Sequence, residues 1–355
     1  MLVFLVPGFF GALAKVVSFE GYNNMRSESV CRTRDYYVHA GHHSDPFTNS
    51  VAFDGWDLEY IQLSSGQYQC NTKELWLSGL QIYTEIGNVT SHQLGIAWAD
   101  SFVFALPWCM ESEGRINGRS WMENDLVIFR GENDYDALVP PTKLLIVAIS
   151  RKVVAEYMEA VEHVSVKDWL KRGMFLVDDT TCTASMTKVF IGMLDVCHDD
   201  PEMLSHPEVR SALMQKAMET LAPVILKNFT VPAIVHREFN HVQIVRRARE
   251  FLVDNISEPM QIIDVCRELR VSRRVLQYSF QDLLNINPVS YLRLLRLNGA
   301  RRDLVSAGDG AVQVKDVVAS WGFWHLSRFS SEYKKIFNEL PSETLNRVKR
   351  DIRAL

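Results

Sequence analysis

The sequence predicts an α+β protein of two domains: a β-rich N-terminal domain shaped as a barrel or jelly roll, and an all-α C-terminal domain with two helix-turn-helix motifs. Three observations lead to this prediction. A helix-turn-helix pattern occurs twice in the last 120 residues, at about 260–284 and 312–337. Short alternating segments with Gly and Asn turns fill residues 51–155, and helical spacing replaces them between 165 and 226. The chain of 355 residues has room for two such domains.

Charge is unevenly distributed along the chain. The net charge is −5, yet residues 236–355 hold 20 Lys and Arg against 14 Asp and Glu, whereas residues 1–235 hold 18 against 29. A basic C-terminal part beside an acidic N-terminal part indicates that the C-terminal part meets a polyanion. No run of 18 apolar residues occurs, so we expect no contact with a membrane.

Residues 1–50 are expected to form an irregular leader. The first 17 residues are nearly all apolar, but they lack the basic start and the cleavage site of a signal peptide. We favour a true translation start downstream, such as Met25, over a weak membrane-associating segment. Six scattered cysteines lack the spacing of a zinc site, which indicates reduced thiols and a cytoplasmic protein.

Residues 51–226 are predicted to bind an effector and to mediate dimerisation. Apolar and polar residues alternate at 60–63 and 74–83, as in half-buried strands. Helical spacing in 208–226 places six apolar residues near one stripe, through which two copies could dimerise. The alternative is that this stripe packs on the β domain. The stripe consists of Val209, Leu213, Met214, Ala217, Leu221 and Val224.

After a linker at 227–240, residues 241–355 are predicted to form the DNA-binding domain. Helices are expected at about 241–255, 260–269, 272–284, 288–305, 314–320 and 325–337, with a last one from 341. Arg246, Arg247 and Arg249 are expected to be exposed on the first helix. Ser272 is a natural N-cap, and Pro288 is favoured in a first helical turn.

The helix at 272–284 has one apolar and one polar stripe. Leu276, Phe280, Leu283 and Leu284 follow helical spacing and are predicted to be buried. Arg can bond guanine and Gln can bond adenine in the major groove, so the opposite stripe is predicted to read DNA. The predicted contacts are Ser272, Arg273, Arg274, Gln277, Tyr278 and Gln281.

The helix at 325–337 repeats this arrangement. A polar stripe can be merely solvated, but two such stripes in tandem favour DNA recognition. The predicted core residues are Leu326, Phe329, Tyr333, Ile336 and Phe337. The predicted contacts are Trp324, His325, Ser327, Arg328, Ser331 and Lys335.

A helix of 18 residues connects the two motifs. At ~1.5 Å per residue it is about 27 Å long, which suits two recognition helices in successive major grooves. Its arginines are expected partly to contact phosphates and partly to pair with nearby acids. They are Arg293, Arg296, Arg301 and Arg302.

Residues 241–345 resemble the DNA-binding domain of the AraC/XylS family of bacterial transcription regulators. The resemblance is carried by Val271-Ser272, Phe280, Pro288-x-x-Tyr291-Leu-Arg, residues 296–304, Val314, Gly322-Phe323, Phe329 and Phe337. Asn285 and Asn338 replace the Gly that usually follows each recognition helix, and Asn tolerates the left-handed conformation needed there. Cys266 and Val318 replace Ala, and we expect the larger Val to separate the helices of the second motif slightly. Residues 321–329 and 337–345 look most like the subgroup with the ethanolamine-utilisation operon regulator.

The resemblance implies a function. It implies a homodimeric, effector-responsive activator of a catabolic operon that binds promoter DNA and contacts RNA polymerase, without catalytic activity or a cofactor. The subgroup implies ethanolamine and a cobalamin as candidate effectors, with an aromatic or other small catabolite as the competitor. A DNA-repair or other enzyme with an attached AraC-like module is the alternative, and a repressor without an effector is a third reading.

Aromatic residues of the β-rich region are candidates for the effector site. Tyr68, Trp76, Tyr83 and Trp98, with Phe102 and Phe104, could line a pocket for a cationic amine, or they could form an ordinary core. Glu74 or Glu85 could pair with the amine, although we expect either to be an exposed strand carboxylate. The cluster of His39, His42 and His43 is expected to be a chance cluster and not a metal site.

Overall fold

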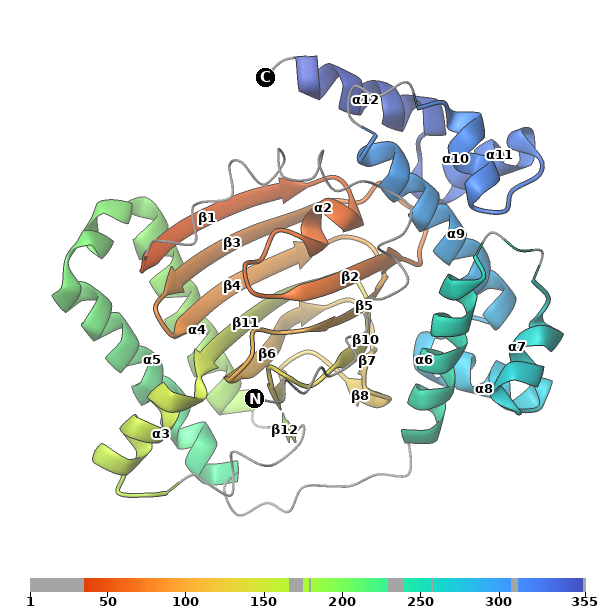
Figure 1. Cartoon of the computed structure of the whole chain (residues 1–355). Helices are drawn as coiled ribbons and strands as arrows, with labels where there is room; N and C mark the ends of the chain where they lie inside the picture. The colour runs from red at the N-terminus through yellow and green to blue at the C-terminus, as the bar shows by residue number, and fades with distance from the viewer. Residues whose placement is uncertain are drawn as a thin grey trace, which may run out of the picture.

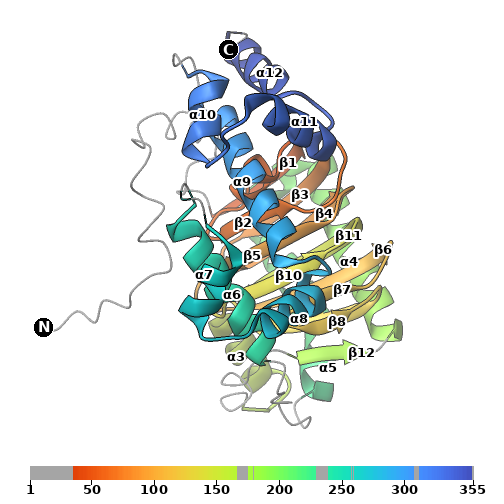
Figure 2. The same cartoon turned by 90° about the vertical axis from the view of Figure 1, so that its right-hand side faces the viewer.

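The computed structural model describes residues 35–165, 175–178, 180–228, 239–256, 258, 260–307 and 312–353. A β-rich N-terminal domain lies beside a helical C-terminal domain, as predicted (Figure 1). The helices of the C-terminal domain line one side of the sheets, where α9 and α8 lie in front of the strands (Figure 2). The predicted linker at 227–240 falls mainly on residues outside the described part of the chain.

Two antiparallel sheets form the N-terminal domain. The seven-stranded sheet has the order β1-β3-β4-β11-β6-β9-β12, and the five-stranded sheet has the order β2-β5-β10-β7-β8. The strands are β1 (Tyr36–His43), β2 (Asp57–Gln62), β3 (Cys70–Leu77), β4 (Leu80–Gly87), β5 (Ser91–Ile96), β6 (Ser101–Met110), β7 (Gly114–Ile116), β8 (Arg119–Trp121), β9 (Asp125–Arg130), β10 (Tyr135–Val139), β11 (Thr142–Ser150) and β12 (Phe175–Asp178). Both sheets are open at their edges and together form a sandwich, so of the two predicted forms, a barrel or a jelly roll, the closed barrel is wrong.

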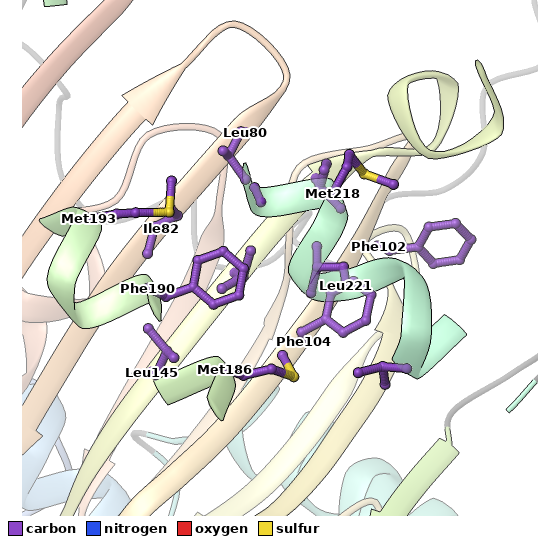
Figure 3. Close-up of a cluster of buried hydrophobic side chains, with 14 of the residues drawn as sticks. Leu80, Ile82, Phe102, Phe104, Leu145, Met186, Phe190, Met193, Met218 and Leu221 are labelled. Atoms are coloured by element: carbon purple, nitrogen blue, oxygen red, sulfur yellow. The ribbon is translucent and has the colours of Figure 1, made fainter. Parts of the chain in front are cut away.

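The larger sheet buries both of its faces because alternate residues of a strand point to opposite sides. In β4, Tyr83 joins the core between the two sheets, whereas Ile82 joins a second core on the other face. That second core is covered by α4 (Thr180–Asp199) and α5 (Pro207–Asn228). Figure 3 shows Phe190 and Met218 of these helices against Ile82, Phe102 and Phe104 of the sheet.

The apolar stripe of 208–226 belongs to this second core. Ala217, Leu221 and Val224 are fully buried, and Leu213 and Met214 pack against them. The alternative that the stripe packs on the β domain of its own chain is therefore confirmed. Leu213 and Met214 stay partly exposed, as does Val209, which is not part of this core.

Four elements of the structure were not predicted from the sequence: β1, α2, α3 and β12. Residues 36–50, which we expected in an irregular leader, contain β1 and the short helix α2 (Pro46–Ser50). Tyr36–His43 pairs along its whole length with β3, and Asp45 caps α2 by accepting from the backbone N–H of Phe47. Residues 151–155, expected within the strand region, begin helix α3 (Arg151–Ala160), which Ser150 caps. β12 lies at the edge of the larger sheet.

The C-terminal helices lie close to their predicted positions. They are α6 (Phe239–Asp254), α7 (Ile262–Leu269), α8 (Arg273–Leu284), α9 (Pro288–Val305), α10 (Val314–Ser320), α11 (Leu326–Phe337) and α12 (Pro341–Arg353), and a 3-10 turn, η5 (Pro201–Ser205), lies between α4 and α5. Ser272 accepts from the N–H of Val275 at 3.2 Å, which confirms the predicted N-cap of α8. Asn285 and Asn338 have φ of 56° and 57°, so both left-handed caps are confirmed.

Candidate nucleic-acid interface

Helix α8 separates its apolar and polar residues as predicted. Leu276, Phe280, Leu283 and Leu284 are at most 1% exposed and join the core formed with α6 and α9. The six predicted contact residues of this motif are all exposed: Ser272, Arg273, Arg274, Gln277, Tyr278 and Gln281. Because the apolar stripe of α8 is buried, the polar stripe on the opposite side of the helix points away from the core.

Helix α11 has the same arrangement with one exception. Phe329, Tyr333 and Phe337 are buried against α9 and α10, whereas Leu326 is 47% exposed, so its predicted place in the core is wrong. Leu326 is the first residue of the helix, where no preceding turn covers it. The predicted contact residues on and before α11 are all exposed: Trp324, His325, Ser327, Arg328, Ser331 and Lys335.

Neighbouring side chains hold some of these residues in place. The guanidinium of Arg274 lies 5.3 Å from the ring centre of Tyr278 and donates to its hydroxyl at 3.2 Å. Arg328 donates to Glu332 at 2.8 Å, and Arg293 of α9 reaches the same carboxylate at 2.7 Å. The positive charge of Arg274 is therefore not compensated by its partner Tyr278, whereas the ion pair with Glu332 partly compensates the charge of Arg328.

A cleft of about 410 Å³ lies between α8 and the smaller sheet. The α8 side contributes two of the predicted DNA-contact residues, Tyr278 and Gln281. The N-terminal half of the polar stripe, with Ser272 and Arg274, lies outside it. The cleft is lined by Glu113, Arg115, Leu138, Tyr278, Gln281, Asp282 and Asn285. The far end of the polar stripe therefore faces the N-terminal domain.

The arginines of α9 were expected partly to pair with nearby acids, which Arg301 does, whereas the burial of Arg249 in α6 was not expected. Arg249 is 6% exposed and pairs with Glu59 of β2, so its expected exposure is wrong. Arg301 is 2% exposed and pairs with Asp45 and Glu339, so it is not available to a phosphate. Arg296 donates to the backbone carbonyls of residues 256 and 258. The position of Arg301 is thus explained by its two ion pairs and not by contact with a DNA phosphate.

Hydrogen bonds to backbone groups also join the two domains. Asn298 of α9 donates to the carbonyl of Gln62 at 3.0 Å and accepts from its N–H at 2.9 Å. β2 is an edge strand, so this side chain occupies hydrogen-bonding groups that would otherwise lack a strand partner. The N–H of Gly66 donates to the carbonyl of Ile336, near the end of α11, at 2.8 Å. The β domain therefore contacts both halves of the helical domain.

Apolar contacts and a buried polar chain cross the same boundary. Ile61, Leu63 and Leu138 of the β domain belong to the core that α6, α8 and α9 form. His92 of β5 lies 3.0 Å from the hydroxyl of Tyr291 in α9 and 2.8 Å from Asp136 in β10. All of these side chains are buried, so the two domains share part of their interior.

The four predicted effector residues lie in the layer between the two sheets or beside it. Tyr83 stacks on Phe53 at 4.1 Å between ring centres, and Trp76 lies 5.7 Å from Trp98. Tyr68 accepts from Asn49 at 2.8 Å. Phe102 and Phe104, which we also expected in this pocket, face α4 and α5 on the opposite side of the sheet, so that expectation is wrong (Figure 3).

Two buried carboxyl groups accompany these aromatic residues. Glu74 is 2% exposed and Glu85 is 4% exposed, so the expectation of exposed carboxylates is wrong. Tyr37 and Gln81 donate to Glu74 at 3.0 and 2.5 Å. Burial raises the pKa of both carboxyl groups to about 7, although the hydrogen bonds to each lower it. The inward direction of residues 72, 74, 83 and 85 follows from the pairing of β3 with β4.

No group of three or more His, Cys, Asp or Glu side chains in the described residues is placed to hold a metal ion. His42 and His43 instead lie within hydrogen-bonding distance of Asn71 and Thr72, at 2.8 and 3.1 Å. Cys70, Cys109, Cys197 and Cys266 have free thiols. Within the same residues, every helix is too short or too polar to cross a membrane.

Comparison with known proteins supports the assignment of the helical domain. Residues 265–347 match a family model described as a helix-turn-helix domain. The chain is 30% identical over 215 residues to the probable thc operon regulatory protein of Rhodococcus erythropolis, which covers 59% of this chain and 62% of that protein. It is 26% identical over 106 residues to the XylDLEGF operon transcriptional activator of Pseudomonas putida, covering 30% and 33%.

A solved structure of a probable AraC family transcriptional regulator from Rhodopseudomonas palustris is 30% identical, covers 30% of this chain and 98% of its own, and has a TM-score of 0.28. The chain spans less than two thirds of the length of the two curated relatives above. The match to the family model falls on α7 to α12, whose geometry is described above. Residues 265–347 therefore form a helix-turn-helix domain, and the chain is similar in part to these operon regulators.

Proposed function

We propose that this protein is a sequence-specific DNA-binding transcriptional regulator, an effector-responsive activator of a catabolic operon that acts as a dimer, contacts RNA polymerase and has no catalytic activity. One observation carries the proposal: on both α8 and α11 the buried apolar stripe leaves the predicted base-reading residues exposed. Both helices lie in a domain of a DNA-binding family. The curated relatives are named as operon regulators, which supports an operon as the target.

In this proposal each domain has a separate function. Residues 241–355 bind DNA, residues 51–226 together with β1 and α2 bind the effector, and residues 227–240 link them. The ion pairs of Arg249 and Arg301 with the β domain support communication between them, because a change in either domain alters contacts of the other. The ethanolamine-type effector stays a prediction.

A mobility-shift assay with promoter DNA tests the proposal. Arg274→Ala and Ser331→Ala are expected to weaken specific binding by roughly 1–3 kcal/mol each if each side chain contacts a base edge. Lys216→Ala, an exposed residue of α5, is the matched control and should leave the affinity unchanged. Unchanged affinity in both test variants would refute the assignment of these residues.

A second experiment separates base reading from phosphate contact. Lys335→Ala should weaken binding to all sequences and reduce the salt dependence of the affinity by about one unit of slope, if this exposed side chain contacts a phosphate. Arg274→Ala should instead reduce the preference for the specific site. The measurement is the affinity for specific and random duplexes at several salt concentrations. Equal behaviour of the two variants would argue against the division of roles.

A further inference from the structure

The carboxyl group of Glu85 is surrounded by neutral hydrogen-bond donors. Asn49 and Gln93 donate to it at 2.8 and 3.4 Å, and Tyr60 donates at 3.1 Å, while the thiol of Cys70 lies 3.9 Å away. Among the described residues, no Lys, Arg or His forms an ion pair with Glu85, in contrast to the buried acids Asp45 and Asp136. Burial without a positive partner is costly for a carboxylate.

A second acceptor beside Glu85 lacks a donor. Asn49 is 0% exposed, and its amide N–H groups serve both Glu85 and the hydroxyl of Tyr68. Those two bonds fix the orientation of the amide, and its carbonyl oxygen is buried with no partner within the described residues. A hydrogen-bond donor is thus missing at the Asn49 carbonyl oxygen, although buried acceptors are usually paired, and a positive partner is missing at the neighbouring Glu85.

Aromatic rings complete the surroundings of the two acceptors. The titratable groups that affect Glu85 or its neighbours are phenols, one thiol and the acids Asp45 and Glu74, and the phenols and the thiol are neutral at pH 7. Burial raises the pKa of each of these phenols and of the thiol. They are Tyr60, Tyr68, Tyr83, Tyr135 and Cys70. Ring faces attract a desolvated cation.

We propose that Glu85 and Asn49 form the binding site of a small ligand with a primary ammonium group, whose N–H groups donate to the Glu85 carboxylate and to the Asn49 carbonyl oxygen. This ligand supplies the donor that the Asn49 carbonyl oxygen lacks and the positive charge that Glu85 lacks. The inference rests on the proposed function, in which the β domain receives an effector, and it names the chemical class of that effector.

The site is connected to the helical domain by two short elements. Asn49 lies in α2, whose N-cap Asp45 pairs with Arg301 of α9. Tyr60 lies in β2, where its neighbour Glu59 pairs with Arg249 of α6. Because Glu85 and Asn49 are both buried, a ligand reaches them only if elements that cover them move, and we expect α2 or β2 to shift. Such a shift changes the contacts of Arg301 or Arg249, so binding at Glu85 is transmitted to the helical domain.

Carboxyl-carbon NMR of the full-length protein, labelled with ¹³C-glutamate, tests the site directly. Glu74 is a matched internal control, because it is equally buried and its pKa is also about 7, but its donors are Tyr37 and Gln81. Glu85→Gln and Glu74→Gln assign the two resonances. Ethylammonium chloride is the probe, and ethanol and potassium chloride at the same concentrations are the controls. A ligand of three heavy atoms is expected to bind with a Kd of about 1 mM at best.

The expected result is a fall in the titration midpoint of Glu85 by about one pH unit when ethylammonium is at ten times its Kd, with no change at Glu74. No response of Glu85 up to roughly fifty times that limiting Kd overturns the proposal. An equal response to ethanol overturns the ammonium class, and a response at Glu74 instead overturns the site. The mobility-shift assay is an independent experiment. If the protein binds DNA but ethylammonium leaves the titration midpoint of Glu85 unchanged, only this inference is refuted. If ethylammonium lowers that midpoint but the protein does not bind DNA, only the proposed function is refuted.

Discussion

At the scale of single residues, Glu74 and Glu85 should make the stability of the protein depend on pH. Burial raises the pKa of both carboxyl groups from 4.5 to about 7. The folded state therefore binds these protons more tightly than the unfolded state. Each group contributes stability that is complete below about pH 4.5 and is lost as the pH rises through about 7. The contribution is on the order of 3 kcal/mol for each group.

Urea unfolding at pH 5.5, 6.5, 7.5 and 8.5 measures this effect. The Glu74→Gln/Glu85→Gln double variant should lose less stability than the wild type between pH 5.5 and 8.5. His43 and His198, whose pKa values burial lowers, give a slope of the opposite sign, but it is the same in both proteins and cancels in the comparison. Parallel curves for the two proteins would show that neither carboxyl group titrates in this range.

Arg301 provides a second residue-scale prediction. Its guanidinium is buried between Asp45 and Glu339, so Arg301→Met leaves Asp45 without its cationic partner and Glu339 with Arg347 alone. We expect a loss of about 3–5 kcal/mol in the free energy of unfolding, partly restored in the Arg301→Met/Asp45→Asn double variant. Arg293→Met on the same helix is the control, since Arg293 is 47% exposed and should contribute at most about 1 kcal/mol. Equal losses in the two single variants would contradict the structural role of Arg301.

Sequence reasoning succeeded for residues whose surroundings lie in the same helix and failed where the surroundings come from another domain. The buried stripe of α8 follows from its own spacing, and Leu276 and Phe280 are buried as predicted. Arg249 and Arg301 also lie on helices with clear spacing, but the β domain covers them. Glu85 is buried by Tyr60 and Asn49, which come from elements far away in the sequence. No local pattern contains that information.

At the scale of secondary-structure elements, the packing of α10 on α9 depends on Gly299. A Cβ atom at this position would overlap the indole ring of Trp321, which is held by its hydrogen bond to Asp303 at 2.6 Å and lies against Arg302. Gly299→Ala should therefore lower the free energy of unfolding by about 1–3 kcal/mol, although Ala is the better helix former.

Gly192→Ala in α4 is the matched substitution. A Cβ atom there meets no atom within 4 Å, so this variant should gain roughly 0.5–1 kcal/mol from its higher helix propensity. Urea unfolding of both variants gives the comparison. A stabilised Gly299→Ala would mean that α10 can move away from α9 without cost, and that Trp321 does not fix the spacing of the second motif.

Most helix ends of the C-terminal domain were predictable because capping chemistry is local. Ser272, Pro288 and the two Asn residues at 285 and 338 mark helix ends in the structure as they did in the sequence. β1 and α2 were not predictable in this way. Tyr36–His43 alternates poorly and owes its extended form to its pairing with β3. Five residues of α2 are too few to show a helical period.

At the scale of the whole molecule, the order of the elements along the sequence predicted the two-domain architecture, but it did not predict the contact between the domains. The β domain and the helical domain share an apolar core, two buried ion pairs and the backbone bonds of Gln62. This contact places the end of the polar stripe of α8 beside the smaller sheet, where Tyr278 and Gln281 line the cleft. Shared interior surface should make the two domains unfold together, because each loses buried area when the other unfolds.

Asn298→Ala tests this coupling. The variant removes both hydrogen bonds to the edge strand β2 and leaves the N–H and the carbonyl of Gln62 without this partner, at about 1–3 kcal/mol for each buried group. The cores of the two domains keep their own residues, so the lost free energy weakens only the interface between them.

Scanning calorimetry should show one transition in the wild type and two overlapping transitions in the variant, with a calorimetric enthalpy above the van't Hoff enthalpy. Asn346→Ala, an exposed residue of α12, should keep the single transition. A single transition in Asn298→Ala as well would mean that the apolar core around Ile61 and Leu138 suffices to hold the domains together.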